Sequence, residues 1–184
     1  MYNNVRFLRL ETKNFRNLRF NKTAIIMKNK LIKDYVQQLH DILDEEVWLD
    51  ENFEKKLSQV SEDKIFIRPI PEIHSVAELI SHLHEWRLET ISRLKGNKQG
   101  FVEDDPRNWR TNDELKPAGW KALKSKFYES QQQLIDFLLK KDDDYLEQKY
   151  PHYTYTNKYL VQGMIQHDVY HLGQLGITIK LLGK

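Results

Sequence analysis

Apolar residues recur every three or four positions along four long stretches of the chain, the spacing that buries one face of an α-helix. The stretches cover residues 28–48, 75–95, 117–138 and 158–182. Four amphipathic helices can close around one core, so the pattern predicts an all-α protein built as a four-helix bundle. The positions that we expect to pack inside are Leu31, Ile32, Tyr35, Val36, Leu39, Ile42, Leu43, Val76, Leu79, Leu83, Trp86, Ile91, Trp120, Leu123, Phe127, Leu134, Leu138, Leu160, Met164, Leu172, Leu175, Ile179 and Leu182.

Local signals mark where the second and third helices begin and end. Ser75 followed by Glu78 has the sequence of a capping box, in which each side chain accepts a hydrogen bond from the backbone N–H of the other residue. Gly96 suits the left-handed residue that stops a helix, and Pro117 suits a first helical turn. The acidic run at residues 142–144 then ends the third helix.

The connections between the helices differ in what they predict. Phe53 and Leu57 indicate a short helical turn after the first helix, and the prolines within residues 65–71 exclude a helix interior. Residues 97–116 are polar and without a period, so we expect a long loop, and such loops are often functional. Residues 150–156 are aromatic and extended, as in a short hairpin-like crossing.

Composition narrows the class of protein. The chain has 184 residues, of which 40% are hydrophobic, and this is enough for one domain with a continuous core. There is no cysteine, which excludes disulfides, thiolate metal ligands and a cysteine nucleophile. No apolar run reaches the roughly 18 residues of a membrane span. In the absence of an export signal we expect a cytoplasmic protein.

The formal net charge of +2 hides an uneven distribution. Residues 1–26 carry six basic side chains and one acidic one, so residues 27–184 sum to −3. Nucleic-acid binding is not expected, because only the N-terminal arm could supply phosphate contacts. The arm resembles organelle transit peptides in composition, but a poorly packed tail, or a start codon upstream of Met27, explains it better. We therefore divide the chain into a basic extension, 1–26, and a folded domain, 27–184.

The strongest chemical signal is the pair His167 and His171 in the last predicted helix. Residues four apart share one face of a helix, so both imidazoles can reach one point, as two ligands of a metal do. The second helix offers His82 and His84, which lie about 200° apart around the axis and cannot both face the interior. His82 lies near the face of Leu79 and is the better third ligand. The alternative is a core histidine bonded to a backbone carbonyl.

These segments together resemble a known family. Residues 75–86 read SVAELISHLHEW and are followed by RLKG at residues 93–96, like the second helix of DinB-like proteins. Residues 167–174 read HDVYHLGQ and resemble the C-terminal signature of that superfamily, a histidine pair followed by Gly-Gln. The Arg-Pro-Ile at residues 68–70 and the tryptophan in the third helix also fit. The likeness covers about residues 30–183.

The resemblance implies an up-down-down-up bundle with a divalent metal site formed by three histidines, which match His82, His167 and His171. Relatives include presumed metal-dependent hydrolases of the YfiT type, transferases or isomerases that use low-molecular-weight thiols, and proteins known only as induced by DNA damage. Three imidazoles leave at least one coordination position open, as a catalytic site requires. Nitrogen ligands favour zinc or nickel over calcium or magnesium.

Other candidate residues around the site carry weaker signals. Gln174 shares the face of His171, where it could bond a water on the metal or equally cap a packing seam. Glu85 could be a base or could support a ligand, although a solvated charge on the helix face explains it better. Asp168 lies about 100° from His167 and is expected to bond a neighbouring helix or loop. Ordinary packing is the preferred explanation for three aromatic residues that could also wall a pocket: Trp109, Tyr153 and Tyr155.

Two classes of function remain open at this point. As an enzyme, the protein would use the metal to activate a small nucleophile, and a thiol for transfer is favoured over water for hydrolysis because no carboxylate base is evident. As a non-catalytic stress-response protein, it would use the metal to stabilise the bundle. The partners to consider are a small-molecule substrate, such as a low-molecular-weight thiol, and a second copy in a homodimer. Neither nucleic acid nor a membrane is expected.

The division of the chain predicts that residues 1–26 contribute little to stability. A chain that begins at Met27 should melt within a few degrees of the full chain, because surface tails seldom contribute more than a few tenths of a kcal/mol. Thermal unfolding of both chains, followed by circular dichroism, measures the difference. Loss of folding on truncation would show instead that the arm packs against the bundle.

Overall fold

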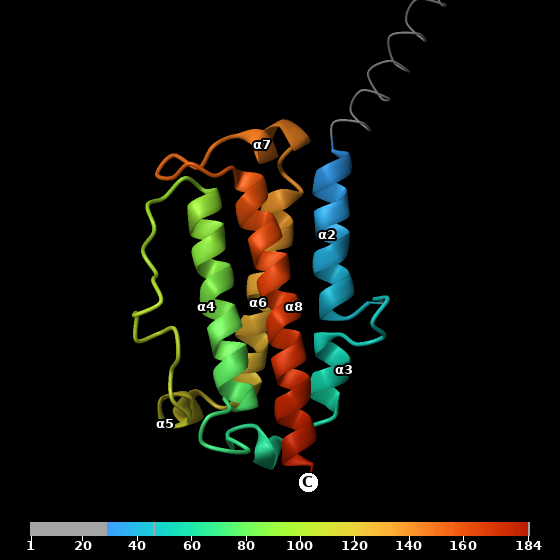
Figure 1. The fold of residues 1–184 in the computed structure, drawn as a ribbon, viewed down its shortest axis with the longest axis vertical. Helices are drawn as coiled ribbons and strands as arrows, with labels where there is room; N and C mark the ends of the chain where they lie inside the picture. Colours follow the sequence, from blue (N-terminus) through green and yellow to red (C-terminus); the bar gives the residue numbers. More distant parts are fainter. Residues whose placement is uncertain (1–28, 46, 184) are drawn as a thin grey trace, which may run out of the picture.

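The computed structural model describes residues 29–45 and 47–183, and within these ranges the regular structure is helical, apart from one isolated β-bridge between Lys149 and Thr156. Four long helices carry the fold: α2 (Lys30–Leu43), α4 (Val76–Leu94), α6 (Trp120–Leu138) and α8 (Asn157–Leu182). In Figure 1, α2 and α8 run downwards while α4 and α6 run upwards. The first and last helices are therefore antiparallel to the middle two. This is the up-down-down-up arrangement that the family resemblance implies.

The directions of α4 and α6 explain why the sequence needs a long connection between them. Because these two helices are parallel, the chain must return along the whole bundle before α6 can begin. Residues 95–111 make this return on the outside of α4 (Figure 1). The shorter elements of the described chain are α3 (Phe53–Ser58), the 3-10 turns η1 (Glu62–Lys64) and η2 (Lys116–Ala118), α5 (Asn112–Leu115) and α7 (Asp143–Glu147).

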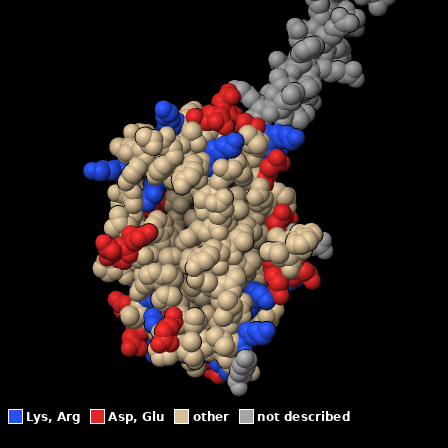
Figure 2. Space-filling model, in the orientation of Figure 1, with Lys and Arg blue, Asp and Glu red and all other residues tan. Residues whose placement is uncertain are grey.

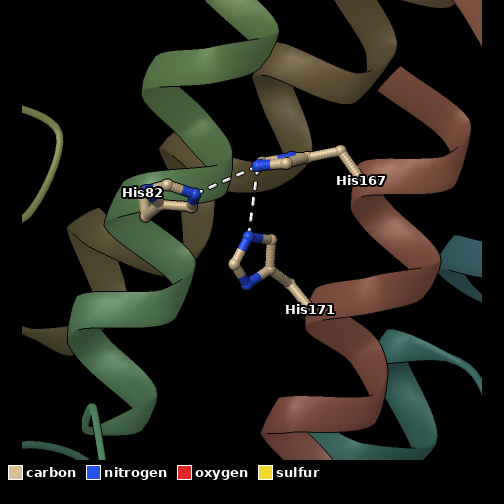
Figure 3. A group of neighbouring side chains, drawn as sticks. All are labelled: His82, His167 and His171. Atoms are coloured by element: carbon tan, nitrogen blue, oxygen red, sulfur yellow. Dashed lines mark hydrogen bonds between the residues drawn. The ribbon is translucent and has the colours of Figure 1, made fainter. Parts of the chain in front are cut away.

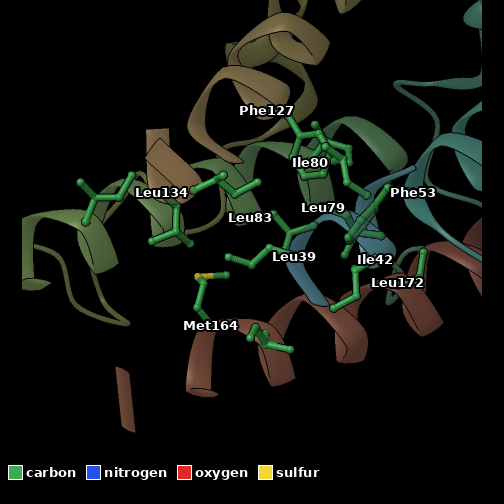
Figure 4. Packing of buried hydrophobic residues seen from close by; sticks show 14 of the residues in the cluster. Leu39, Ile42, Phe53, Leu79, Ile80, Leu83, Phe127, Leu134, Met164 and Leu172 are labelled. Atoms are coloured by element: carbon green, nitrogen blue, oxygen red, sulfur yellow. The ribbon is translucent and has the colours of Figure 1, made fainter. Parts of the chain in front are cut away.

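Helix α4 lies at the centre of the packing. It contacts both α6 and α8, and its Leu79, Ile80 and Leu83 lie in the same apolar cluster as Phe127 of α6 and Leu172 of α8 (Figure 4). The long connection covers a further side of the helix, so even polar residues of α4 are buried. Buried polar groups must find hydrogen-bond or metal partners inside the protein. This requirement explains the polar clusters described below.

The start and stop signals of α4 are confirmed. Ser75 and Glu78 form the predicted capping box, and Gly96 follows the helix with a φ of 86°. Helix α6 begins at Trp120 rather than near Pro117, because Gly119, with a φ of 78°, separates the 3-10 turn η2 from the helix. The predicted first helix is too long at its C-terminal end, since α2 ends at Leu43.

The N-terminal end of α2 is capped from a distant part of the chain. The side chain of Asn29 makes no capping hydrogen bond, whereas the Asp143 carboxylate in α7 accepts from the backbone N–H groups of Leu31 and Ile32, both at 3.0 Å. The acidic run that was predicted to end the third helix therefore also fixes the first one. Leu31 is 37% exposed, so its predicted place in the core is wrong.

The sequence also predicted that no segment spans a membrane and that the folded domain begins at residue 27. No described helix is both long enough and apolar enough to cross a membrane. The basic extension, residues 1–26, lies outside the described residues, so the proposed domain boundary stays a prediction.

The capping box at α4 should make stability depend on pH in the acidic range. Burial alone would raise the pKa of Glu78, but hydrogen bonds from His74, from Arg68 and from the Ser75 backbone outweigh it and lower the pKa to about 2. The folded-state pKa therefore lies below the ordinary value of 4.5. The stabilisation is complete above pH 4.5 and is lost as the pH falls towards 2.

We therefore expect Glu78→Gln to lower the melting temperature at pH 7 by about 5 °C, through the loss of charged hydrogen bonds. Between pH 4.5 and 2 the variant should lose less stability than the wild type. Thermal melts across this range test the expectation. If the melting temperatures of the variant and the wild type fall equally as the pH is lowered, another carboxylate determines stability at acidic pH.

Candidate metal centre

Three histidine side chains from two helices meet inside the bundle. His82 extends from the middle of α4 towards α8, where His167 and His171 lie one turn apart on the same face (Figure 3). The Nε2 atom of His167 is 3.0 Å from that of His82 and 3.1 Å from that of His171. His82 and His171 are buried, and His167 is partly buried. The cluster can hold a metal ion, because each residue offers one ligand atom to a common point.

In two of the three rings, a hydrogen bond to the outer nitrogen sets which nitrogen can bind a metal, whereas the Nδ1 of His167 has no partner among the described residues. His82 Nδ1 lies 3.0 Å from the backbone carbonyl of Asn108, and His171 Nδ1 lies 2.7 Å from Oε1 of Gln174. Because these oxygens can only accept, both Nδ1 atoms carry the proton and both Nε2 atoms keep a lone pair. The arrangement directs the free lone pairs towards the centre of the cluster.

Burial keeps the three rings neutral at physiological pH. It lowers the pKa of His82 to about 4 despite the hydrogen bond that the ring donates to the Asn108 carbonyl, and it lowers the pKa of His167 to about 3 with the help of the neighbouring histidines. The pKa of His171 is lowered for the same reason, burial. Neutral imidazoles are the protonation state that metals require.

The geometry also suits the ion that these donors prefer. Nitrogen ligands at 2.0–2.1 Å in a tetrahedral zinc site lie about 3.3 Å from one another. The observed Nε2 separations of 3.0 and 3.1 Å are close to that spacing. Three nitrogen donors therefore fit a divalent metal ion, and they leave at least one position for another ligand.

The connection between α4 and α5 closes the site through Asn108. Besides accepting from His82, this buried residue accepts from Trp86 Nε1 through its side-chain oxygen, at 2.9 Å. Its amide nitrogen donates to the backbone carbonyl of Glu103 at 2.8 Å. The next residue, Trp109, stacks on the His82 ring with the centroids 3.9 Å apart. One short segment thus fixes both the orientation of His82 and the wall beside it.

A pocket of about 630 Å³ lies over the histidines. Its size is within the range of small-molecule sites. Glu103, Asp104 and Tyr170 at its edge are exposed, so the pocket is open to solvent on that side. Its lining consists of His82, Trp86, Glu103, Asp104, Asn108, Trp109, His167, Tyr170 and His171.

A fully buried ion pair lies next to the cluster and joins the same two helices. Arg87 Nη2 of α4 donates to Asp168 Oδ2 of α8 at 3.0 Å, and Arg87 Nη1 donates to the backbone carbonyl of Phe127 at 3.2 Å. The guanidinium also lies over the Phe127 ring, 4.1 Å from its centroid. Asp168 therefore bonds a neighbouring helix, as the sequence predicted. Because Asp168 follows His167, the pair helps to fix the rotation of α8 at the site.

The remaining sequence candidates have mixed outcomes. Gln174 bonds directly to His171, which is neither of the two roles considered for it. Glu85 is not a solvated charge as expected: it is buried and forms an ion pair with Arg110 at 2.8 Å, because the long connection covers this side of α4. His84 lies outside the histidine cluster.

The three aromatic candidates separate into two groups. Trp109 lines the pocket, so its role is more than the ordinary packing that was preferred. Tyr153 and Tyr155 stack on each other and on Tyr150, and they do not line it. The sequence did not predict three further residues that line the pocket: Glu103, Asp104 and Asn108. The only sequence signal for them was the length of the loop in which they lie.

The family of the chain follows from comparison with known proteins. The sequence profile of the DinB family matches residues 27–184. The chain therefore belongs to the DinB family, the class of helical bundle that its fold and its three histidines indicated. No curated protein matches the chain.

Two crystal structures share the fold. A conserved protein from Enterococcus faecalis has a TM-score of 0.59 and 19% sequence identity, over 84% of this chain and 97% of that one. The colibactin self-resistance protein ClbS, solved in complex with a double-stranded DNA, has a TM-score of 0.56 and 19% identity, over 82% of this chain and 92% of that one. At this identity the likeness is one of fold.

Metal content after histidine replacement tests the composition of the centre. His82→Ala, His167→Ala and His171→Ala should each reduce bound zinc from about one ion per chain to near zero after dialysis, because two imidazoles hold the ion much more weakly than three. Elemental analysis of the purified variants measures this ratio. His84→Ala is the matched control on α4 and should keep the metal. Full retention in both His82→Ala and His171→Ala would exclude the site.

Proposed function

We propose that the protein is a metal-dependent enzyme in which His82, His167 and His171 hold one divalent transition metal and a small nucleophile is activated there. The observation that carries the proposal is the convergence of three neutral Nε2 donors on the floor of an open pocket. A purely structural site would instead close all its coordination positions with protein ligands. Zinc and nickel suit these donors best.

The favoured reaction is transfer of a low-molecular-weight thiol to an electrophile. A bound zinc or nickel ion would supply the Lewis acidity that lowers the pKa of the thiol, so no carboxylate base is needed. In the transfer the S–H proton passes to solvent, an S–C bond forms, and the leaving group departs with the electron pair of the bond that breaks. The histidines would position the reacting sulfur, and Trp86 and Trp109 line the pocket beside it.

The position of Glu85, the candidate base, favours a thiol over water as the nucleophile. Glu85 is held by Arg110 and does not line the pocket. Hydrolysis needs a base within hydrogen-bond reach of the attacking water. The two carboxylates that do line the pocket, Glu103 and Asp104, make hydrolysis of the YfiT type the second candidate function. A non-catalytic, metal-stabilised protein of a stress response is the remaining alternative.

ClbS was solved in complex with a double-stranded DNA, but we do not propose that this chain binds DNA. Residues 27–184 carry a net charge of −3, and the candidate pocket is lined by two carboxylates and by no lysine or arginine of the described residues. Binding to a phosphate backbone depends on clustered positive charge. A small molecule is therefore the partner that we propose.

Turnover assays separate the three functions. With zinc or nickel bound, the protein should accelerate addition of at least one thiol to 1-chloro-2,4-dinitrobenzene by at least about 100-fold, a modest value for an enzyme. The rate should vanish on chelation and return when the metal is restored. His167→Ala is the control.

The outcome of a broader panel decides among the alternatives. If no thiol shows metal-dependent turnover while ester or amide substrates do, the protein is a hydrolase and the thiol reaction is excluded. If the metal-loaded protein turns over neither thiols nor ester and amide substrates, we conclude that the metal has a non-catalytic role.

A further inference from the structure

The mouth of the pocket carries two carboxylates that form no ion pair within the part of the chain that the structure describes. Glu103 and Asp104 both line the pocket, and neither forms an ion pair with a described residue. The two nearest arginines in sequence are engaged elsewhere. Arg107 donates to both carboxylate oxygens of Asp105, at 2.9 and 2.6 Å, and Arg110 pairs with Glu85. Figure 2 shows a group of acidic side chains at the left edge of this face, with Lys and Arg side chains above and below it and little charge in the middle of the face.

The backbone that carries these carboxylates is fixed relative to the histidines. Asn108 donates through its side chain to the Glu103 carbonyl and through its backbone N–H to the Asp105 carbonyl, each at 2.8 Å. The Asp105 N–H in turn donates to the Val102 carbonyl at 3.1 Å. Since Asn108 also accepts from His82, the acidic edge and the floor of the pocket are parts of one hydrogen-bonded unit.

Aromatic rings occupy the walls between the floor and the edge. The ring centroid of Trp86 lies 5.9 Å from that of His167, and the ring centroid of Trp109 lies 6.0 Å from that of His171. Tyr170 is an exposed third aromatic residue of the lining. Two imidazoles, those of His74 and His82, already stack on Trp109, and the Arg93 guanidinium lies over Trp86. Tyr170 is therefore the aromatic residue of the lining that is exposed to an incoming cation, which the quadrupole of its ring attracts.

We propose that the pocket selects a small molecule that carries an ammonium group, and that the nucleophile is an aminothiol. The inference rests on the proposed thiol reaction. The sulfur would face the three histidines, where an anion is favoured once the metal adds its charge. The ammonium group would face Glu103 and Asp104 beside the exposed Tyr170. The pocket is thus divided into an end that favours negative charge and an end that favours positive charge.

Three thiols of similar size but different charge test this selection. We would titrate the zinc-loaded full chain with 2-aminoethanethiol, 2-mercaptoethanol and 3-mercaptopropionate by calorimetry at low salt. The aminothiol should bind about tenfold more tightly than the neutral thiol, and the anionic thiol should bind most weakly. The preference should shrink as salt screens the exposed carboxylates. Equal affinities for the first two thiols would overturn the proposal.

A double variant shows whether the acidic edge causes the preference. Glu103→Gln with Asp104→Asn should bring 2-aminoethanethiol to the affinity of 2-mercaptoethanol, without changing the latter. Both side chains are exposed, so the fold should survive, and circular dichroism checks this. Glu62→Gln with Asp63→Asn removes the same two charges from residues outside the pocket lining and should leave the preference intact. A preference that survives in the first variant, for instance through chelation of the metal by the amine, would overturn the proposal.

Propylamine and 1-propanol separate this inference from the proposed function, because neither contains a thiol. Their binding to metal-free protein is followed through quenching of tryptophan fluorescence, since Trp86 and Trp109 wall the pocket. If propylamine is favoured in the wild type but not in the Glu103→Gln, Asp104→Asn variant, ammonium selection holds even where no thiol is turned over. Equal weak binding of both probes would overturn the selection while leaving the thiol assays to judge the reaction.

Discussion

Three imidazole Nε2 atoms from two helices meet in one place, with that of His167 lying 3.0 and 3.1 Å from those of His82 and His171, and the rest of the site is organised around this constraint. Such an arrangement is unfavourable unless a proton or a cation lies between the nitrogens. Burial disfavours a second, charging proton on any ring, because it lowers the pKa of each. Among the described residues the Nδ1 of His167 has no partner, so without a metal a neutral His167 can carry its proton on Nε2 and donate it to one of the other two rings. Two of the three outer nitrogens are already bonded to oxygens that can only accept. A divalent metal bound by all three Nε2 atoms would satisfy the three rings at once.

The bundle topology supplies the parts that two helices alone could not. Because α4 and α6 are parallel, the chain must return along the outside of α4, and this return brings Asn108 and Trp109 over His82. On the opposite helix, the buried pair of Arg87 and Asp168 fixes α8 against α4 next to His167. The site therefore depends on one connection and one ion pair as well as on its three histidines.

Helical periodicity made the core of the site predictable. The pair His167 and His171 follows from a spacing of four, and His82 follows from its place near the apolar face of its helix. The capping box at Ser75 was equally local, and it was predicted correctly. The histidine pair and the capping box each join residues three or four apart, where sequence spacing and spatial distance correspond, whereas for His82 the sequence indicated only the helical face and not its partner on α8.

The remainder of the site depends on contacts between residues far apart in the chain. Glu85 appeared solvated because its partner, Arg110, belongs to a loop without a regular pattern. Asn108 offered no signal, since its role arises from a backbone carbonyl placed by the fold. The cap of α2 lies more than 100 residues away, on Asp143. Loop conformation of this kind is set by tertiary contacts rather than by local propensity.

The central claim is that three imidazoles, and no other protein groups, hold the metal. X-ray absorption at the zinc edge of the metal-loaded full chain tests this directly. We expect three imidazole nitrogens at about 2.0–2.1 Å, with their characteristic outer-shell scattering, and one further light ligand. A shell made only of oxygen, or one with fewer than three imidazoles at full zinc occupancy, would contradict the account.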